Sequence, residues 1–211
     1  MTEAEWLACG EPRAMLRFLR GRVSDRKFRL FGSACYLNLW SKVPVAELYR
    51  DVLRASEAYA ERQITKQEFK VVRKRGDYDK APRVFGEAWE VAQSSAQDCS
   101  GESFNWTPVG DGRAYRSVRE RPEVVSTHCT FVRDIFGNPF RPVTFAPSWR
   151  TDTAVSLAKQ MYESREFGAM PILADALQDA GCDNPDILDH CRGPGPHVRG
   201  CWVVDLVLGK G

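Results

Sequence analysis

The sequence predicts an all-α protein, an irregular multi-helix bundle of roughly eight to ten helices with one long irregular insertion. Apolar residues recur at three- and four-residue steps along most of the chain, as they do on one face of a helix. Capping residues and prolines stand where these runs begin, and glycines stand where several of them end. No convincing pair of strands is present, so short connections between packed helices are expected.

The first 97 residues predict a basic helical part. Thr2 with Glu5, and Thr65 with Glu68, have the capping-box spacing, in which a side chain at each end of the first turn bonds the backbone of the other. Ser24 is the expected cap of the clearest amphipathic helix in this half. The expected helices cover residues 2–9, 14–20, 25–41, 44–62, 66–75 and 83–97.

Residues 98–121, rich in Ser, Gly, Asn, Asp and Pro, are expected to be an irregular linker or insertion and the only plausible domain boundary. Residues 122–211 are expected to form an acidic helical part, and the alternative is that the whole chain is one continuous domain. Residues 140–149 should be extended, because two prolines interrupt them. The expected helices start at Pro122, Thr151 or Thr153, Pro171 and Pro185. The apolar stretch at residues 197–208 fits a buried helix or a buried strand, and a helix that ends at Gly209 is favoured.

Composition excludes several classes of protein. The 211 residues are 43% hydrophobic and 27% charged, ordinary values for a globular protein. The chain has no run of eighteen apolar residues and no secretory signal at its start, so a soluble cytoplasmic protein without membrane contact is expected. Seven cysteines without regular spacing indicate reduced thiols. No Walker, Rossmann, HExxH or GxSxG motif is present, which favours a protein that is not an enzyme.

Charge is unevenly distributed, although the net charge is only +2. Residues 11–31 hold seven basic and two acidic residues, whereas residues 151–191 hold eight acidic and two basic residues. Clustered Lys and Arg are typical of phosphate-binding surfaces, and the alternative is a solvated helix face. The candidate nucleic-acid-binding residues are Arg13, Arg17, Arg20, Lys70, Arg73 and Lys74.

Residues 181–211 hold three of the seven cysteines and two of the three histidines. Cys and His are ligands that zinc prefers, and four of them can close a tetrahedral site. Adjacent His190 and Cys191 would point to different sides of a helix, so at most one of them should bind. The predicted zinc ligands are Cys182, Cys191, His197 and Cys201. Because no CxxC spacing occurs, the alternative is that these cysteines are small buried core residues.

A catalytic interpretation of the same stretch also exists. Cys191 would be the nucleophile, His197 its base and Asp205 the residue that orients the base. Nothing in the spacing requires this arrangement, because such residues meet in space and not along the chain.

Three blocks of the sequence carry a resemblance: the opening MTEAEWLACGEPRAMLRFLRGRVSDRKFRLF, the central RDIFGNPFRPV and the closing HCRGPGPHVRGCWVVDLVLGK. Together they resemble a family of bacterial proteins associated with planctomycetes, for which no activity, substrate or cofactor is established. The resemblance implies a bacterial cytoplasmic protein and gives no mechanism.

The leading hypothesis is a non-enzymatic, helical interaction or regulatory module that binds a protein partner or itself. Bipolar charge, abundant tryptophan and missing catalytic motifs favour it. One alternative is a nucleic-acid-binding protein that uses the basic N-terminal helices. The other is a small zinc-binding or Cys-dependent protein centred on the C-terminal Cys and His residues.

Overall fold

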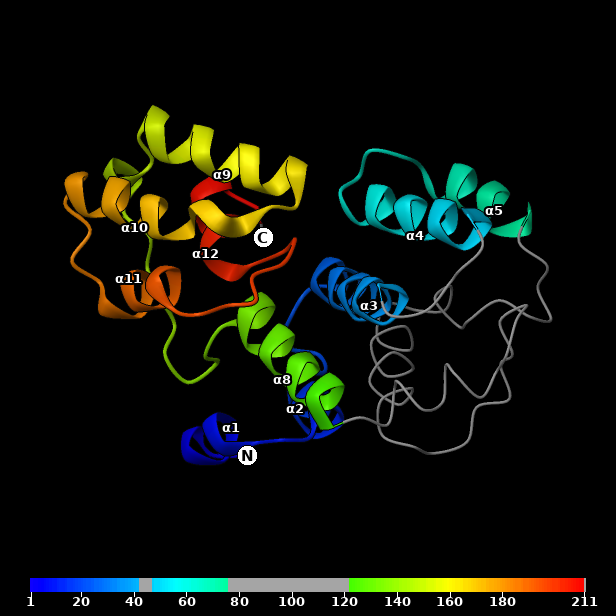
Figure 1. Cartoon of the computed structure of the whole chain (residues 1–211), viewed down its shortest axis with the longest axis horizontal. Helices are drawn as coiled ribbons and strands as arrows, with labels where there is room; N and C mark the ends of the chain where they lie inside the picture. Colours follow the sequence, from blue (N-terminus) through cyan, green and yellow to red (C-terminus); the bar gives the residue numbers. More distant parts are fainter. Residues whose placement is uncertain (42–46, 76–121, 211) are drawn as a thin grey trace. The chain divides into compact units, whose positions relative to one another are not determined.

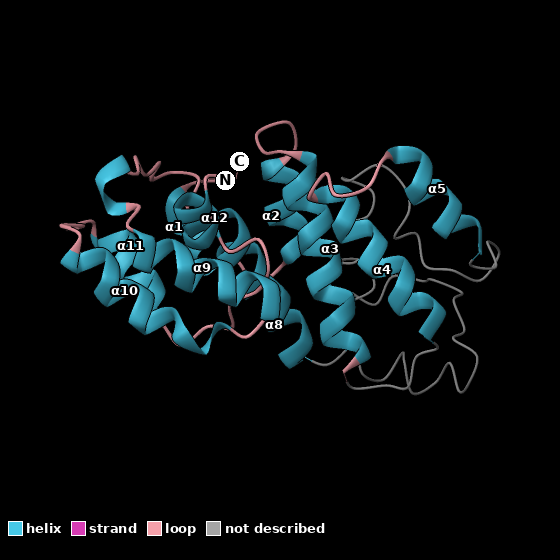
Figure 2. Cartoon of the chain, turned by 90° about the horizontal axis from the view of Figure 1, so that it is seen from above, coloured by secondary structure: helices cyan, strands magenta, loops and turns pink. Residues whose placement is uncertain are grey.

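The predicted all-α class is confirmed by the computed structural model, which describes residues 1–41, 47–75 and 122–210. These residues form ten α-helices and two short 3-10 turns, and they contain no strand (Figures 1 and 2). The helix expected at residues 83–97 and the insertion expected at 98–121 lie outside the described residues.

The chain divides into two compact units within helix α8 (Pro122–Phe136). The first unit runs to Val132, and the second begins at Arg133. The boundary expected at residues 98–121 lies outside the described part of the chain.

The first unit opens with a short helix pair. Trp6 of α1 packs on Phe18 of α2, with ring centroids 6.2 Å apart. Trp6 itself is buried, so the apolar side of α1 is fixed by this contact. The helices of this unit are α1 (Glu3–Ala8), α2 (Pro12–Leu19), α3 (Asp25–Trp40), α4 (Glu47–Ala60) and α5 (Lys66–Arg75), followed by the start of α8.

Helices α3, α4 and α5 pack in sequence order. An ion pair of 2.9 Å joins Arg26 of α3 to Glu61, which directly follows α4. Tyr59 of α4 stacks on Phe69 of α5 with ring centroids 5.2 Å apart. The capping box expected at Thr65 is present, because the Thr65 N–H donates to the Glu68 carboxylate at 2.7 Å and the Glu68 N–H donates back to Thr65 Oγ1.

The second unit is built on four helices that contact one another in a closed cycle, α9 on α10, α10 on α11, α11 on α12 and α12 on α9 (Figure 1). Their inward sides form one core of Ala, Met, Leu, Val and Cys side chains. The bounds are α9 (Asp152–Ser164), α10 (Met170–Asp179), α11 (Pro185–Arg192) and α12 (Trp202–Leu208), with 3-10 turns at Pro147–Trp149 and Phe167–Ala169.

Local signals in the sequence set the ends of these helices. Thr151 Oγ1 accepts the Ala154 N–H at 3.2 Å, and Asn184 Oδ1 accepts the Ile187 N–H at 3.2 Å, so both residues are N-caps. Gly209 ends α12 in the left-handed conformation, with φ of 67°. One expectation needs correction, since Pro147–Trp149 of the segment expected to be extended forms a 3-10 turn. None of the described helices combines the length and apolarity that crossing a bilayer requires.

Candidate metal centre

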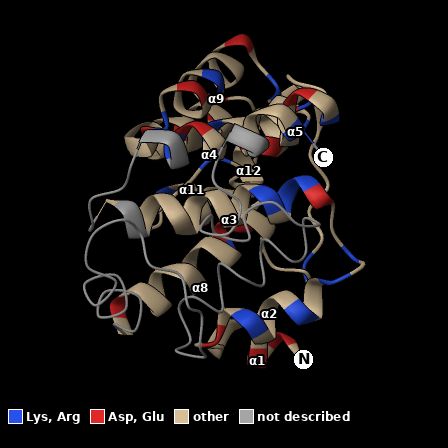
Figure 3. Cartoon of the chain, turned by 90° about the vertical axis from the view of Figure 1, so that its right-hand side faces the viewer, with Lys and Arg blue, Asp and Glu red and all other residues tan. Residues whose placement is uncertain are grey.

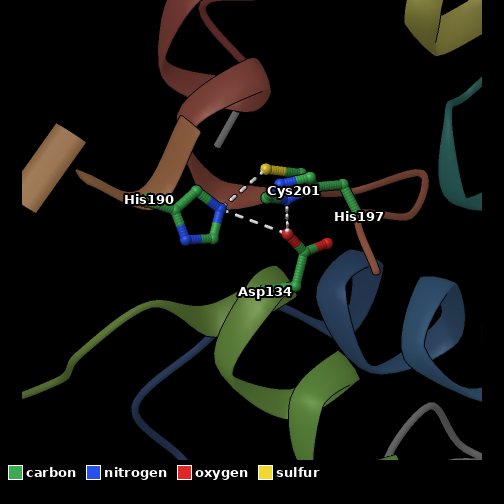
Figure 4. Close-up of side chains that lie close together, drawn as sticks. All are labelled: Asp134, His190, His197 and Cys201. Atoms are coloured by element: carbon green, nitrogen blue, oxygen red, sulfur yellow. Dashed lines mark hydrogen bonds and ion pairs between the residues drawn. The ribbon is translucent and has the colours of Figure 1, made fainter. Parts of the chain in front are cut away.

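Four side chains of the second unit converge on one point (Figure 4). Asp134 comes from the last turn of α8, His190 from α11, His197 from the loop between α11 and α12, and Cys201 from the N-cap of α12. Their candidate ligand atoms all lie within 4.8 Å of one another. Three helices and the loop between two of them therefore bring together two imidazoles, a carboxylate and a thiol.

The contacts centre on the Asp134 oxygen Oδ1 and on His190 Nε2. Oδ1 lies 2.7 Å from His197 Nδ1 and 3.1 Å from His190 Nε2, and the same His190 nitrogen lies 3.2 Å from Cys201 Sγ. Neighbouring ligands of a tetrahedral zinc ion are about 3.3 to 3.6 Å apart, given zinc–nitrogen and zinc–sulfur bonds of about 2.0 and 2.3 Å. The three short contacts need to open by about 0.6 Å at most to match that geometry.

Asp134 is held so that one oxygen faces the other three side chains. The backbone N–H of Val198 donates to Oδ2 at 2.9 Å, which leaves Oδ1 for the histidines. Burial raises the pKa of Asp134, since only 2% of its side chain is exposed, but the hydrogen bonds and charges of His190 and His197 outweigh burial and leave the pKa below its usual value. The carboxylate is therefore ionised and oriented before any ligand binds.

Cys201 is fully buried. Burial raises the pKa of its thiol well above the usual range, the Asp134 charge adds to that effect, and the backbone N–H groups of Val204 and Val203 oppose it. A thiol with a raised pKa and no access to solvent is a poor nucleophile. A metal ion can still bind it, because coordination displaces the thiol proton.

His197 is nearly buried and keeps one ring nitrogen without a partner. Its Nδ1–H donates to Asp134, while Nε2 is buried and makes no hydrogen bond. A buried polar atom without a partner is costly. His197 can bind a metal at the cluster through Nδ1, the nitrogen that faces Asp134.

The arrangement differs from a thiol–imidazole–carboxylate triad. In such a triad the histidine contacts the nucleophile through one ring nitrogen and the carboxylate through the other. Here His190 meets both Cys201 and Asp134 through Nε2. One nitrogen cannot relay a proton between the two, but several donor atoms around one point are what a metal ion requires.

Of the zinc ligands predicted from the sequence, the structure brings His197 and Cys201 into this cluster. Cys182 and Cys191 lie in the apolar core of the second unit, and neither belongs to the four-residue group found among the described residues. Burial raises the pKa of Cys191 to about 12 and also raises that of Cys182. Helix α11 contributes His190 to the cluster instead of the predicted ligand Cys191. Adjacent positions on a helix face different sides, and Cys191 faces the core.

The catalytic set of Cys191, His197 and Asp205 is spread over three places in the second unit. Cys191 is a core residue of α11, Asp205 is buried within α12, and His197 bonds the carboxylate of Asp134. Cys182, Cys191 and Cys201 form no disulfide.

Asp134 is the one member of the cluster that lies outside the Cys- and His-rich stretch of residues 181–211. A signal for it exists, since a negative charge in the last turn of a helix opposes the helix dipole, and Asp134 stands beside the buried Val132 and Ile135. A buried acid at that position therefore needs partners, which the two histidines supply.

The basic residues considered for nucleic-acid binding lie in the first unit. Arg17 and Arg20 are exposed, Arg13 is half-buried and Lys70 is exposed on α5, whereas the side chains of Arg73 and Lys74 lie outside the described residues. Figure 3 shows the basic residues of α2 near acidic residues of α1.

No family model, curated protein sequence or solved structure matches the chain.

Proposed function

We propose that the second unit is a zinc-binding helical module in which Asp134, His190, His197 and Cys201 surround one Zn²⁺. The convergence of the four donor groups on one point carries this proposal. Two imidazoles, a carboxylate and a thiolate suit zinc, whereas Mg²⁺ and Ca²⁺ prefer sites made only of oxygen ligands.

The ion would have a structural role. Four protein ligands fill the tetrahedral shell of zinc, while catalytic sites keep a position open for water or substrate. The ligand side chains are well shielded, since Asp134 and Cys201 are buried and His190, the most accessible, is 19% exposed. The ion would tie the end of α8 to α11 and α12, and metal binding would contribute directly to folding.

A helical module stabilised in this way is suited to binding another molecule, which agrees with the interaction or regulatory role expected from the sequence. The kind of partner is still the one expected from the sequence, a protein or a second copy of the chain. A protein partner or a second copy of the chain would be detected by sedimentation of the zinc-loaded protein, alone and with candidate partners.

Zinc content tests the proposal. Purified protein is stripped with a chelator, dialysed against zinc, and its zinc-to-protein ratio is measured by inductively coupled plasma mass spectrometry. We expect one zinc per chain for the wild type and for Asp175→Ala, whose exposed carboxylate lies in the same unit and pairs with Arg192. His190→Ala should lose the zinc. Metal-free wild type, or full retention by His190→Ala, contradicts the proposal.

Nucleic-acid binding is a second candidate, favoured by the exposed Arg17 and Arg20 of α2. It predicts binding to a DNA or RNA oligonucleotide that weakens steeply as salt is raised, because phosphate contacts release counterions. Replacing both arginines with glutamine should flatten the salt dependence, and salt-independent binding or none argues against this candidate.

A further inference from the structure

The indole of Trp202 lies beside the cluster formed by Asp134, His190, His197 and Cys201. Trp202 directly follows Cys201 and is the first residue of α12. Its ring centroid is 5.2 Å from that of His190, with the two planes tilted by 54°. The ring of His197 contacts the same imidazole edge-on, with centroids 4.9 Å apart and the planes inclined by 69°. The His190 imidazole is therefore in contact with two aromatic rings, those of Trp202 and His197.

Gly137 provides the space that the indole occupies. This glycine follows α8 with φ of 68°, and its N–H donates to the Arg133 carbonyl at 2.9 Å. A Cβ added at Gly137 would lie 3.2 Å from Cγ of Trp202 and within 3.5 Å of two further indole atoms. A contact of 3.2 Å is closer than ordinary carbon packing, so any larger residue here would displace the indole.

His190 needs such support more than the other three side chains. It stands on the eight-residue helix α11, and it is the most exposed of the four. To reach both Asp134 and Cys201 through one nitrogen, its imidazole must keep one rotamer. A partly exposed side chain has several rotamers available, and ring packing from one side restricts them.

We propose that Trp202 is a positioning residue of the metal site, and that its indole, seated on Gly137, holds His190 turned toward Asp134 and Cys201. The proposal rests on the zinc site proposed above. Outer partners of ligating histidines influence metal affinity by about 10- to 100-fold, and Trp202 would act in this range through packing.

Cobalt binding tests this role. Co²⁺ replaces zinc in tetrahedral sites and reports its ligand geometry through visible absorption bands. The metal-free proteins are titrated with Co²⁺ and then with zinc in competition with a chelator. Trp202→Leu keeps apolar volume and removes the ring, whereas Trp202→Phe keeps a ring. Trp149→Leu is the matched control, because Trp149 is a half-buried tryptophan of the same unit that packs on Phe145.

We expect Trp202→Leu to bind zinc about 10- to 100-fold more weakly with a changed Co²⁺ spectrum, and Trp202→Phe to lose less than about 10-fold. Trp149→Leu should keep the wild-type affinity and spectrum. Unchanged affinity and spectrum in Trp202→Leu overturn the positioning role and leave the zinc site intact. A wild-type chain that binds neither metal overturns the zinc site, and the positioning role with it.

A second pair of variants tests the positioning role of Trp202 if Trp202→Leu does not fold. Gly137→Ala places a methyl group against the indole, and Gly181→Ala places one at a similar positive φ, 88°, where nothing lies within 4 Å. Weaker binding in Gly137→Ala than in Gly181→Ala supports the proposal, and equal binding in the two overturns it.

Discussion

Two buried cysteines of the second unit offer a matched test of the zinc site. Cys191 and Cys201 are both fully buried and belong to the same apolar core, but only Cys201 lies in the cluster with Asp134, His190 and His197. Replacing either with alanine removes one sulfur atom from the core. The packing loss should be about 1 kcal/mol in each case. In the presence of a chelator the two variants should therefore have similar stability.

Zinc should stabilise Cys191→Ala more than Cys201→Ala. At a free zinc concentration 100 times the dissociation constant, binding stabilises a folded protein by about 2.7 kcal/mol. Wild type and Cys191→Ala should gain this amount, which for a chain of this size raises the melting temperature by roughly 5 to 11 °C. If loss of the thiolate weakens zinc binding about 100-fold, Cys201→Ala gains only about 0.4 kcal/mol at the same zinc concentration.

The assay is thermal unfolding followed by circular dichroism of the helices, with chelator and with zinc. Equal zinc-dependent shifts in Cys191→Ala and Cys201→Ala refute the ligand assignment. Loss of the shift in both variants favours the ligand set expected from the sequence, which included both cysteines. The absence of any shift in the wild type refutes the zinc site itself.

Three further predictions concern single residues. Burial lowers the pKa of His128 to about 3 from 6.5, so the folded state binds fewer protons than the unfolded state between these values. The stability that His128 contributes is complete above pH 6.5, and the free energy of unfolding is about 2 kcal/mol lower at pH 5. Denaturant unfolding of His128→Asn should lack this pH dependence. Arg150 donates to the Leu206 and Val207 carbonyls at 2.8 and 2.9 Å, so Arg150→Ala should lower the free energy of unfolding by about 1 to 2 kcal/mol in the same assay. A Cβ at Gly195 would lie 3.1 Å from the backbone nitrogen of His197, so Gly195→Ala should weaken zinc binding by about 10-fold in chelator competition, which Gly181→Ala should not do.

The helices were predictable because their signals are local. Thr65 with Glu68, Thr151 and Asn184 bond the backbone within one turn, so the sequence alone locates these helix starts. The structure confirms the all-α class for the same reason. The insertion expected at residues 98–121 remains a prediction, since it lies outside the described residues.

The candidate site was only half predictable because its members are far apart in the sequence. His197 and Cys201 stood out through their residue types in a short stretch. Asp134 lies on a different helix, and only folding brings it to the histidines. The choice between His190 and Cys191 depended on which side of α11 faces the core, and a short helix with two candidate ligands side by side does not reveal that from its sequence.

X-ray absorption at the zinc edge of the zinc-loaded wild-type protein tests the central claim most directly, because it distinguishes sulfur from nitrogen and oxygen ligands. The cluster of Asp134, His190, His197 and Cys201 predicts one sulfur at about 2.3 Å and the remaining ligands, all nitrogen or oxygen, at about 2.0 to 2.2 Å. A shell with two or three sulfur ligands would place Cys182 or Cys191 on the metal and contradict the cluster. A shell with no sulfur would remove Cys201 from it, and a protein that takes up no zinc would contradict the metal site altogether.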